Sequence, residues 1–489
     1  MLKSLKTVLL ILLCGTMLFS ACTKPSPEPE NTSGTSTATV EDIVTDSTPT
    51  TTPETETTPV ETNLEINLHI DGRTNYMELL IEQFKKEHPE VTVHTTDYSD
   101  LWPADYHAKL ASQMMTGEGP DVLLIINTSN ENMDTFHSMT KMVQSNIFMD
   151  INELDIDLSG CNETVMKAGT FGDKQILLPL NYSLGFLYTT EERLNEAGIS
   201  YYDGITLEEF ASAFPDFYEN NPDKKAFLNW LAGQDLFPHN SLCMVDYANN
   251  QFIDSEENQQ KLTQLTHAFD NLFPEIFSSS EAAMGYMFYL NLNKYGSTDR
   301  EIYQSGDLLF MSNRGFSGAY DNILTYNNHV YPDDISKGET PIMFAMPTIT
   351  GEPPSPNVTY MLAANANTEN TEAVKLFMET AIGIDFQYIT TGTGIPVNQD
   401  LVDRMESFYL AEGYDPHDPY LFPKTCEFDK EFVEEYFSTI DNMSDPIPFM
   451  DSTTTGYIFS IIRNSITGDM TFEEAYSSAK SQIDFYLSE

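Results

Sequence analysis

Residues 64–93 read LEINLHIDGRTNYMELLIEQFKKEHPEVTV, and this stretch decides the fold. Apolar and polar side chains alternate over residues 64–70, and this alternation predicts a β-strand. Apolar residues then recur at helical spacing over residues 77–86, and Pro89 ends this helix because proline disfavours helix at the residue before it. Residues 91–93 begin a second strand. The order of strand, short helix and strand predicts a βαβ unit whose two strands are parallel.

A second unit of the same kind follows. Residues 106–115 form an amphipathic helix, and residues 121–126 (DVLLII) are apolar after the first aspartate, as expected for a central strand of a parallel sheet. In open α/β sheets, ligands bind beyond the carboxyl ends of the strands. Asp71, Arg73 and Asn127 follow the ends of predicted strands, so they are candidate ligand contacts.

The N-terminus has the features of a secretory signal. Lys3 and Lys6 precede an apolar run at residues 8–19, which is shorter than the roughly 20 residues that a membrane span needs. Residues 1–21 are similar to a bacterial lipoprotein signal peptide, and that resemblance implies cleavage before Cys22 and lipidation of this cysteine. The alternative is an ordinary secretory signal followed by a cysteine that occurs there by chance.

Residues 22–63 predict a disordered tether between Cys22 and the folded part. The segment is rich in Thr, Ser, Pro and Glu and has hardly any large apolar side chain. It therefore cannot bury enough surface to offset the entropy that ordering would cost.

Composition excludes several classes of function. The chain has 489 residues, with 75 acidic and 24 basic side chains and a formal net charge of −51. A surface this acidic repels nucleic acid and anionic lipid headgroups. The sequence contains neither HExxH nor GxSxG, and pairs of carboxylates are expected by chance among so many acids. We therefore predict no catalytic residues, no metal and no cofactor.

The cysteines outside the signal give little guidance. Cys161, Cys243 and Cys426 are widely spaced and form no CxxC pair, so neither a zinc knuckle nor a redox dithiol is predicted. Three buried thiols are the preferred interpretation, and one disulfide with one free thiol is the alternative.

A series of segments resembles the extracellular solute-binding proteins of ABC importers, family 1, the sugar-binding type. Examples are FKKEHPEVTV at 84–93, FGDKQILLPL at 171–180 and TGTGIPVN at 391–398. The other segments occur in the family's order along the chain: 109–122, 147–154, 187–199, 206–210, 303–311, 344–347, 370–378 and 466–475.

The resemblance implies a two-lobed α/β fold of the periplasmic-binding-protein type (type II), with mixed, mainly parallel sheets flanked by helices and a hinge between the lobes. Residues 64–179 and 355–397 would form lobe one, and residues 180–354 and 398–489 would form lobe two. A solute would be held in the cleft between the lobes when the hinge closes. The permease and the ATPase of the importer would be separate chains, and we expect this chain to be a monomer.

Sugar-binding clefts combine aromatic platforms with planar polar partners. The chain has two tryptophans, Trp102 and Trp230, and both are candidates for such platforms. Where the family commonly has an aromatic contact after a glycine, usually a tryptophan, this chain has Phe316. The remaining candidates are at the hinge, near Phe316 and at the start of a C-terminal segment: Asn181, Tyr182, Arg314, Tyr320 and Asp451.

These observations predict a lipid-anchored receptor at the outer face of the cell membrane, in a bacterium with a single membrane. Its ligand would be a mono- or oligosaccharide that it delivers to an ABC permease. Two alternatives have the same anchor: a surface receptor that feeds a sensor kinase, and an extracellular hydrolase of glycans.

Overall fold

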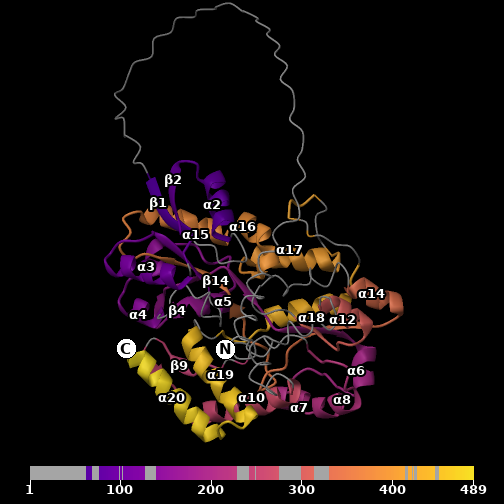
Figure 1. Ribbon diagram of the computed structural model, residues 1–489. Coiled ribbons are helices and arrows are strands. Elements are labelled where there is room, and N and C mark those ends of the chain that lie inside the picture. Colours follow the sequence, from indigo (N-terminus) through magenta and orange to yellow (C-terminus); the bar gives the residue numbers. More distant parts are fainter. Residues whose placement is uncertain are drawn as a thin grey trace, which may run out of the picture. The chain divides into compact units, whose positions relative to one another are not determined.

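The predicted βαβ unit is present in the computed structural model of the chain (Figure 1). Strands β1 (Thr62–Leu68) and β2 (Val91–Asp97) pair in parallel, with Leu64 opposite Val93. Helix α2 (Tyr76–Glu87) buries one face along its whole length, from Tyr76 to Phe84. Strand β1 begins two residues before the expected start of the folded part.

All described residues belong to one compact unit, Val60–Glu489. The predicted signal, Cys22 and nearly all of the predicted tether lie outside the described residues. The structure describes residues 62–68, 76–98, 100–101, 103–126, 139–227, 240, 242–247, 249–274, 299–312, 330–412, 417–420, 422, 427–446 and 451–488.

The first sheet has the strand order β2-β1-β3-β14-β6. Strand β3 (Val122–Ile126) is central and buries most of its side chains on both faces, as its continuous apolar sequence predicted. Strand β14 (Tyr360–Ala364) runs antiparallel to β3 and to β6 (Leu178–Pro179). Helices α2, α15 (Thr371–Ile382) and α16 contact one another beside this sheet.

The second sheet is antiparallel and has the order β11-β8-β12. Its strands are β8 (Phe186–Thr190), β11 (Met311–Ser312) and β12 (Pro341–Ala345). In the described part of the chain, the strands that pair in parallel are β1 with β2 and β1 with β3, and one isolated parallel bridge joins Lys225 and Leu308. The sheets are therefore mixed, as expected, but they are not mainly parallel.

A buried carboxylate lies next to the second sheet. Asp334 has no exposed surface, and the Tyr188 and Tyr303 hydroxyls donate hydrogen bonds to its Oδ2 at 2.9 and 3.1 Å. The Arg193 guanidinium lies 3.6 Å from Asp334 Oδ1 and also donates to the Tyr303 carbonyl at 2.8 Å. Burial raises the pKa of Asp334, while Tyr188 and Arg193 oppose that shift. This cluster joins α6, α12 and α14 to strand β8.

A third, small sheet joins the other two and is called the crossing sheet below. It has the order β13-β7-β15, with β7 (Asn181–Ser183), β13 (Asn357–Val358) and β15 (Ile395–Pro396). The chain passes through it from β6 to β8, from β12 to β14, and from α16 to α17. The two larger sheets are therefore connected by three strands that meet at β7.

The remaining helices surround the two sheets (Figure 1). Helices α19 and α20 pack against each other, and α19 also packs against α10. The bounds are α3 (Pro103–Met115), α4 (Met139–Gln144), α5 (Glu163–Met166), α6 (Glu191–Ala197), α7 (Leu207–Ala211), α8 (Phe214–Asn220), α10 (Glu256–Leu272), α12 (Asp299–Ser305), α14 (Val330–Lys337), α16 (Ile384–Ile389), α17 (Gln399–Leu410), α18 (Lys430–Asp441), α19 (Ser452–Thr467) and α20 (Phe472–Ser488). The short elements are β4 (Thr170–Phe171), β5 (Lys174–Gln175), β9 (Val245–Asp246), β10 (Gln251–Phe252) and the 3-10 turns Ile151–Leu154, Lys167–Gly169 and Thr391–Thr393.

Candidate functional site

Asn181, in β7 of the crossing sheet, ties this strand to β14 and to the turn before β15. Its side chain is buried, and its Nδ2 donates to the Thr393 carbonyl at 3.0 Å and to the Thr393 hydroxyl at 3.1 Å. Its Oδ1 accepts a hydrogen bond from the Tyr360 backbone N–H at 3.1 Å. One amide thus bonds the segments that enter β14 and β15. These are structural hydrogen bonds, and contact between Asn181 and a ligand stays a prediction.

Tyr182, the next residue of β7, is fully buried, and its hydroxyl has no hydrogen-bond partner. Burial raises the pKa of Tyr182, and the negative charge of Asp441 on α18 adds to the shift. The backbone around it is closely packed, since a Cβ on Gly394 would come within 3.0 Å of the Tyr182 carbonyl oxygen. Only a residue without a side chain fits there, so β15 can approach β7 closely.

Asp451 lies apart from Asn181 and Tyr182, at the start of α19. It is 1% exposed, its Oδ1 accepts from the Thr454 N–H at 3.0 Å, and its Oδ2 accepts from the Tyr486 hydroxyl at 2.8 Å. The Asp451 backbone N–H donates to the Tyr247 hydroxyl at 3.2 Å. The carboxylate caps α19 and links it to α20. Its predicted contact with a ligand is untested.

Eight predicted contacts and the lipidation site lie outside the described residues. They are Asp71, Arg73, Trp102, Asn127, Trp230, Arg314, Phe316, Tyr320 and Cys22.

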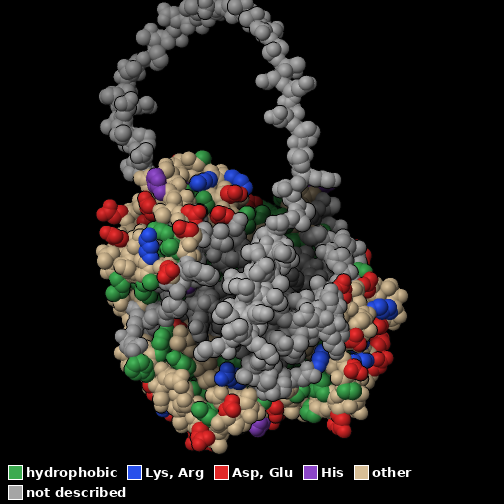
Figure 2. Space-filling view, in the orientation of Figure 1, with side chains coloured by type: hydrophobic (Ala, Val, Ile, Leu, Met, Phe, Trp, Pro, Cys, Tyr) green, Lys and Arg blue, Asp and Glu red, His purple; other side chains and the backbone are tan. Residues whose placement is uncertain are grey.

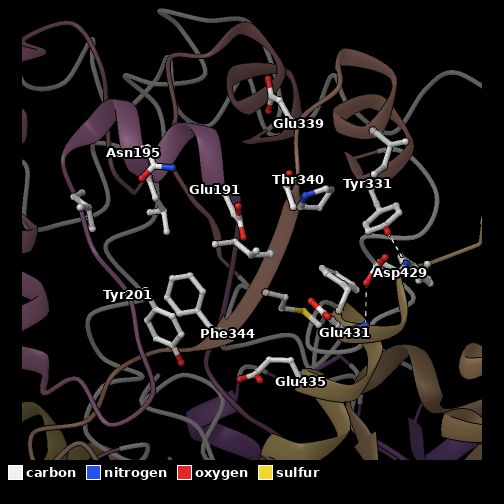
Figure 3. Close-up of a pocket in the computed structure, with 18 of the residues that line it drawn as sticks. Glu191, Asn195, Tyr201, Tyr331, Glu339, Thr340, Phe344, Asp429, Glu431 and Glu435 are labelled. Carbon is white, nitrogen blue, oxygen red and sulfur yellow. Dashed lines mark hydrogen bonds between the residues drawn. The ribbon is translucent and has the colours of Figure 1, made fainter.

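A groove that the sequence did not predict lies beside strand β12 (Figure 3). It has a volume of about 1060 Å³ and is lined by residues from 191–203, 331–344 and 427–435. The rings of Tyr201 and Phe344 stack with centroids 3.7 Å apart, and the Glu435 side chain extends toward them (Figure 3). Burial, followed by the charge of Asp203, raises the pKa of Glu435. No pattern in the sequence predicts this groove, because acidic residues are frequent throughout the chain.

Residues 70–387 match the family model of the bacterial extracellular solute-binding proteins. The chain belongs to this family. Members of the family are binding proteins rather than enzymes, and the family name places them outside the cytoplasm. A search of curated proteins finds no match to the chain.

Solved structures of solute-binding proteins share the fold of this chain. The GacH receptor of Streptomyces glaucescens, solved without ligand and with acarbose, has a TM-score of 0.55 at 15% identity, covering 88% of this chain and 99% of that one. An ABC substrate-binding protein of Listeria monocytogenes in complex with cycloalternan has a TM-score of 0.56 at 13% identity, with coverage of 88% and 100%. Maltose-bound MalE3 of T. maritima has a TM-score of 0.52 at 16% identity, with coverage of 86% and 99%. The predicted two-lobed fold is confirmed.

The described part of this solute-binding protein bears on the sequence predictions for metal ligands, membrane spans and cysteines. There, no three His, Cys, Asp or Glu side chains are arranged to hold a metal ion. None of the helices described is both long enough and apolar enough to span a bilayer. Cys161 and Cys243 are free and half-buried rather than buried as predicted, and Cys426 lies outside the described residues.

Acidic side chains spread over the described surface in the view of Figure 2, where basic ones are few. This distribution agrees with the formal net charge of −51. Some of the basic groups form ion pairs, such as Lys167 with Asp445 at 2.6 Å and Arg404 with Asp418 at 2.5 Å. The described surface of the solute-binding protein is therefore predominantly negative.

Proposed function

We propose that this solute-binding protein captures a carbohydrate in the cleft between its lobes and delivers it to an ABC permease. The observation that carries the proposal is the crossing sheet, in which three strands connect two α/β units. A ligand that contacts both lobes only when they close shifts the population toward the closed form. Permease subunits can distinguish that form from the open one.

Support for a carbohydrate comes from the structural relatives. Three of them were solved with acarbose, cycloalternan and maltose, all of which are sugars or sugar-like. The predicted contacts include aromatic platforms and planar polar groups, the combination that sugar rings and hydroxyls require. Trp102, Trp230 and Phe316 are the proposed platforms.

We place the lobe boundaries at the crossing strands. Lobe one comprises residues 64–179 and 355–397, and lobe two comprises residues 180–354 and 398–489. The passage from β6 to β7, the strand β13 and the strand β15 lie near the three boundaries, which supports this division. In this arrangement the side chain of Asn181 is the hinge bond, and the chain acts as a monomer.

We also propose that Cys22 carries a lipid and that residues 22–63 tether the folded part to the outer face of a cell membrane. The secretory features of residues 1–21 support the proposal. Replacing Cys22→Ala should move the protein from the membrane fraction into the medium. A variant that stays with the membrane would show that another segment anchors the chain.

A thermal-shift screen of mono- and oligosaccharides tests the ligand class. A sugar present at 100 times its Kd stabilises the folded state by about 2.7 kcal/mol. For a unit of this length, that corresponds to a rise in melting temperature of roughly 3 °C. Trp230→Ala should abolish the shift, whereas Phe485→Ala, which removes an exposed aromatic ring from α20, should not.

Three results would overturn the proposal or a part of it. A shift with peptides or polyamines in the cleft and with no sugar would refute the carbohydrate assignment. Turnover of an oligosaccharide by the purified protein would show that it is a hydrolase. Co-purification with a sensor kinase rather than a permease would favour a sensing role for the same fold.

A further inference from the structure

The groove beside β12 is separate from the proposed interlobe cleft. Its three lining segments, 191–203, 331–344 and 427–435, all fall in proposed lobe two. Among the described lining residues, none comes from lobe one. A ligand that closes the hinge must touch both lobes, so an occupant of this groove is a second ligand.

The walls of the groove are largely aromatic and aliphatic. Tyr201 is half-buried and stacks on Phe344 with an interplanar angle of 23°. On the opposite wall, Phe428 and Phe432 stack with centroids 5.4 Å apart, and Tyr331 meets Phe428 edge-on at 4.7 Å. Phe344, Tyr331, Phe428 and Phe432 are themselves only 1–9% exposed. The apolar surface open to an occupant is therefore mainly that of half-buried Tyr201 and of Ile335, which is 50% exposed.

The rim of the groove is acidic and lacks internal neutralisation. Seven carboxylates line it, and its described lining includes no Lys, Arg or His. Glu339 is paired with Arg193 at 3.2 Å, at one end. Within the described part of the chain, no cation lies within ion-pair distance of Asp203, Glu431 or Glu435. Burial raises the pKa of Glu435, and repulsion by the Asp203 carboxylate adds to that shift.

We propose that this groove binds an aliphatic polyamine, with its ammonium groups at the carboxylates and its methylene chain along the aromatic walls. Glu431, Glu435 and Glu191 line the groove from different segments (Figure 3). Ammonium groups spaced along one methylene chain can reach several such carboxylates at once. A neutral sugar would leave these carboxylates without counter-charge, and a metal ion would leave the apolar walls unused. The volume of about 1060 Å³ is at the upper end of the range for small-molecule sites.

Isothermal titration of the full chain with spermine at physiological salt tests the proposal. The groove variant is Asp203→Asn with Glu435→Gln. The control is Asp270→Asn with Asp484→Asn, which changes the net charge equally at exposed positions on α10 and α20. We expect one saturable site, an affinity at least tenfold weaker in the groove variant, and a change of no more than twofold in the control.

If both variants bind spermine equally more weakly, spermine responds only to the overall charge, and the proposal is overturned. The absence of saturable binding would also overturn it. Tighter binding of pentalysine than of spermine would assign the groove to a basic protein segment instead. Melting curves of both variants exclude unfolding as the cause of lost affinity. The proposal does not depend on the carbohydrate assignment, because spermine binding should be unchanged by a saturating sugar.

Discussion

Replacing Asn181→Ala is the most direct test of the crossing sheet. The change removes two hydrogen bonds to Thr393 and one from the Tyr360 N–H. A lost hydrogen bond costs about 0.5–1.5 kcal/mol, and a buried N–H left without an acceptor costs about 1–3 kcal/mol. Because the two bonds to Thr393 share one donor group, we expect a total loss of about 2–4 kcal/mol.

That loss corresponds to a fall in melting temperature of about 2–4 °C for a unit of this length. Differential scanning calorimetry can measure it. Asn220→Ala is the matched control, because Asn220 is exposed and donates only to the Asp216 carbonyl within its own helix. A fall of less than about 1 °C for Asn181→Ala, or a fall equal to that of the control, would refute the assignment of Asn181 as the residue that holds β7 to β14 and to the turn before β15.

Three further outcomes are expected. Arg193→Met removes the guanidinium beside the buried Asp334 carboxylate and its hydrogen bond to the Tyr303 carbonyl, while Lys337 stays 3.5 Å from Asp334 Oδ1. It should lower the free energy of unfolding by about 1–3 kcal/mol, measured as a lower denaturant midpoint; an unchanged midpoint would contradict this. Burial raises the pKa of Cys161 to about 11, so labelling of Cys161 by a maleimide should rise about tenfold per unit between pH 8 and 10, and a plateau in that range would refute the shift. The pKa of Glu435 is higher in the folded protein than in the unfolded chain, where it is about 4.3, so Glu435 stabilises the fold less as the pH rises above about 4.3. Glu435→Gln should therefore have a higher melting temperature than the native protein at pH 7 and the same one at pH 4. Equal melting of the variant and the native protein at both pH values would show that neither burial nor Asp203 destabilises the charged form of Glu435.

Local periodicity explains why part of the fold could be predicted. Strands β1 and β3 and helix α2 each carry their own pattern of apolar residues, and their pairing follows from the short connections between them. Strands of two residues, such as β13 and β15, have no period to detect. β14 pairs antiparallel with β3 although the two strands lie far apart in the sequence. Because local patterns do not reveal such a pairing, the predicted excess of parallel pairs was wrong.

From the sequence, the kinds of residue at the site could be predicted, but not the residues that they contact. Asn181 was recognised as a hinge position, but its partners Thr393 and Tyr360 lie 212 and 179 residues away in the sequence. The groove beside β12 depends on a similar convergence, in which Tyr201, Phe344 and Glu435 come from three separate segments. Among 75 acidic residues, nothing in the sequence distinguishes the few whose charges face one another.

The crossing sheet has a construction that suits hinge closure. Strand β7 pairs with β13 and with β15 through only two register pairs each, at residues 181–183. So few ladder bonds give little resistance to rotation, and the three strands need a further connection to stay together. The Asn181 amide adds bonds to Tyr360 at the start of β14 and to Thr393 just before β15, which would keep these segments attached to β7 during a rotation. In the proposed hinge, closure around a ligand would therefore bend these short strands rather than the two larger sheets.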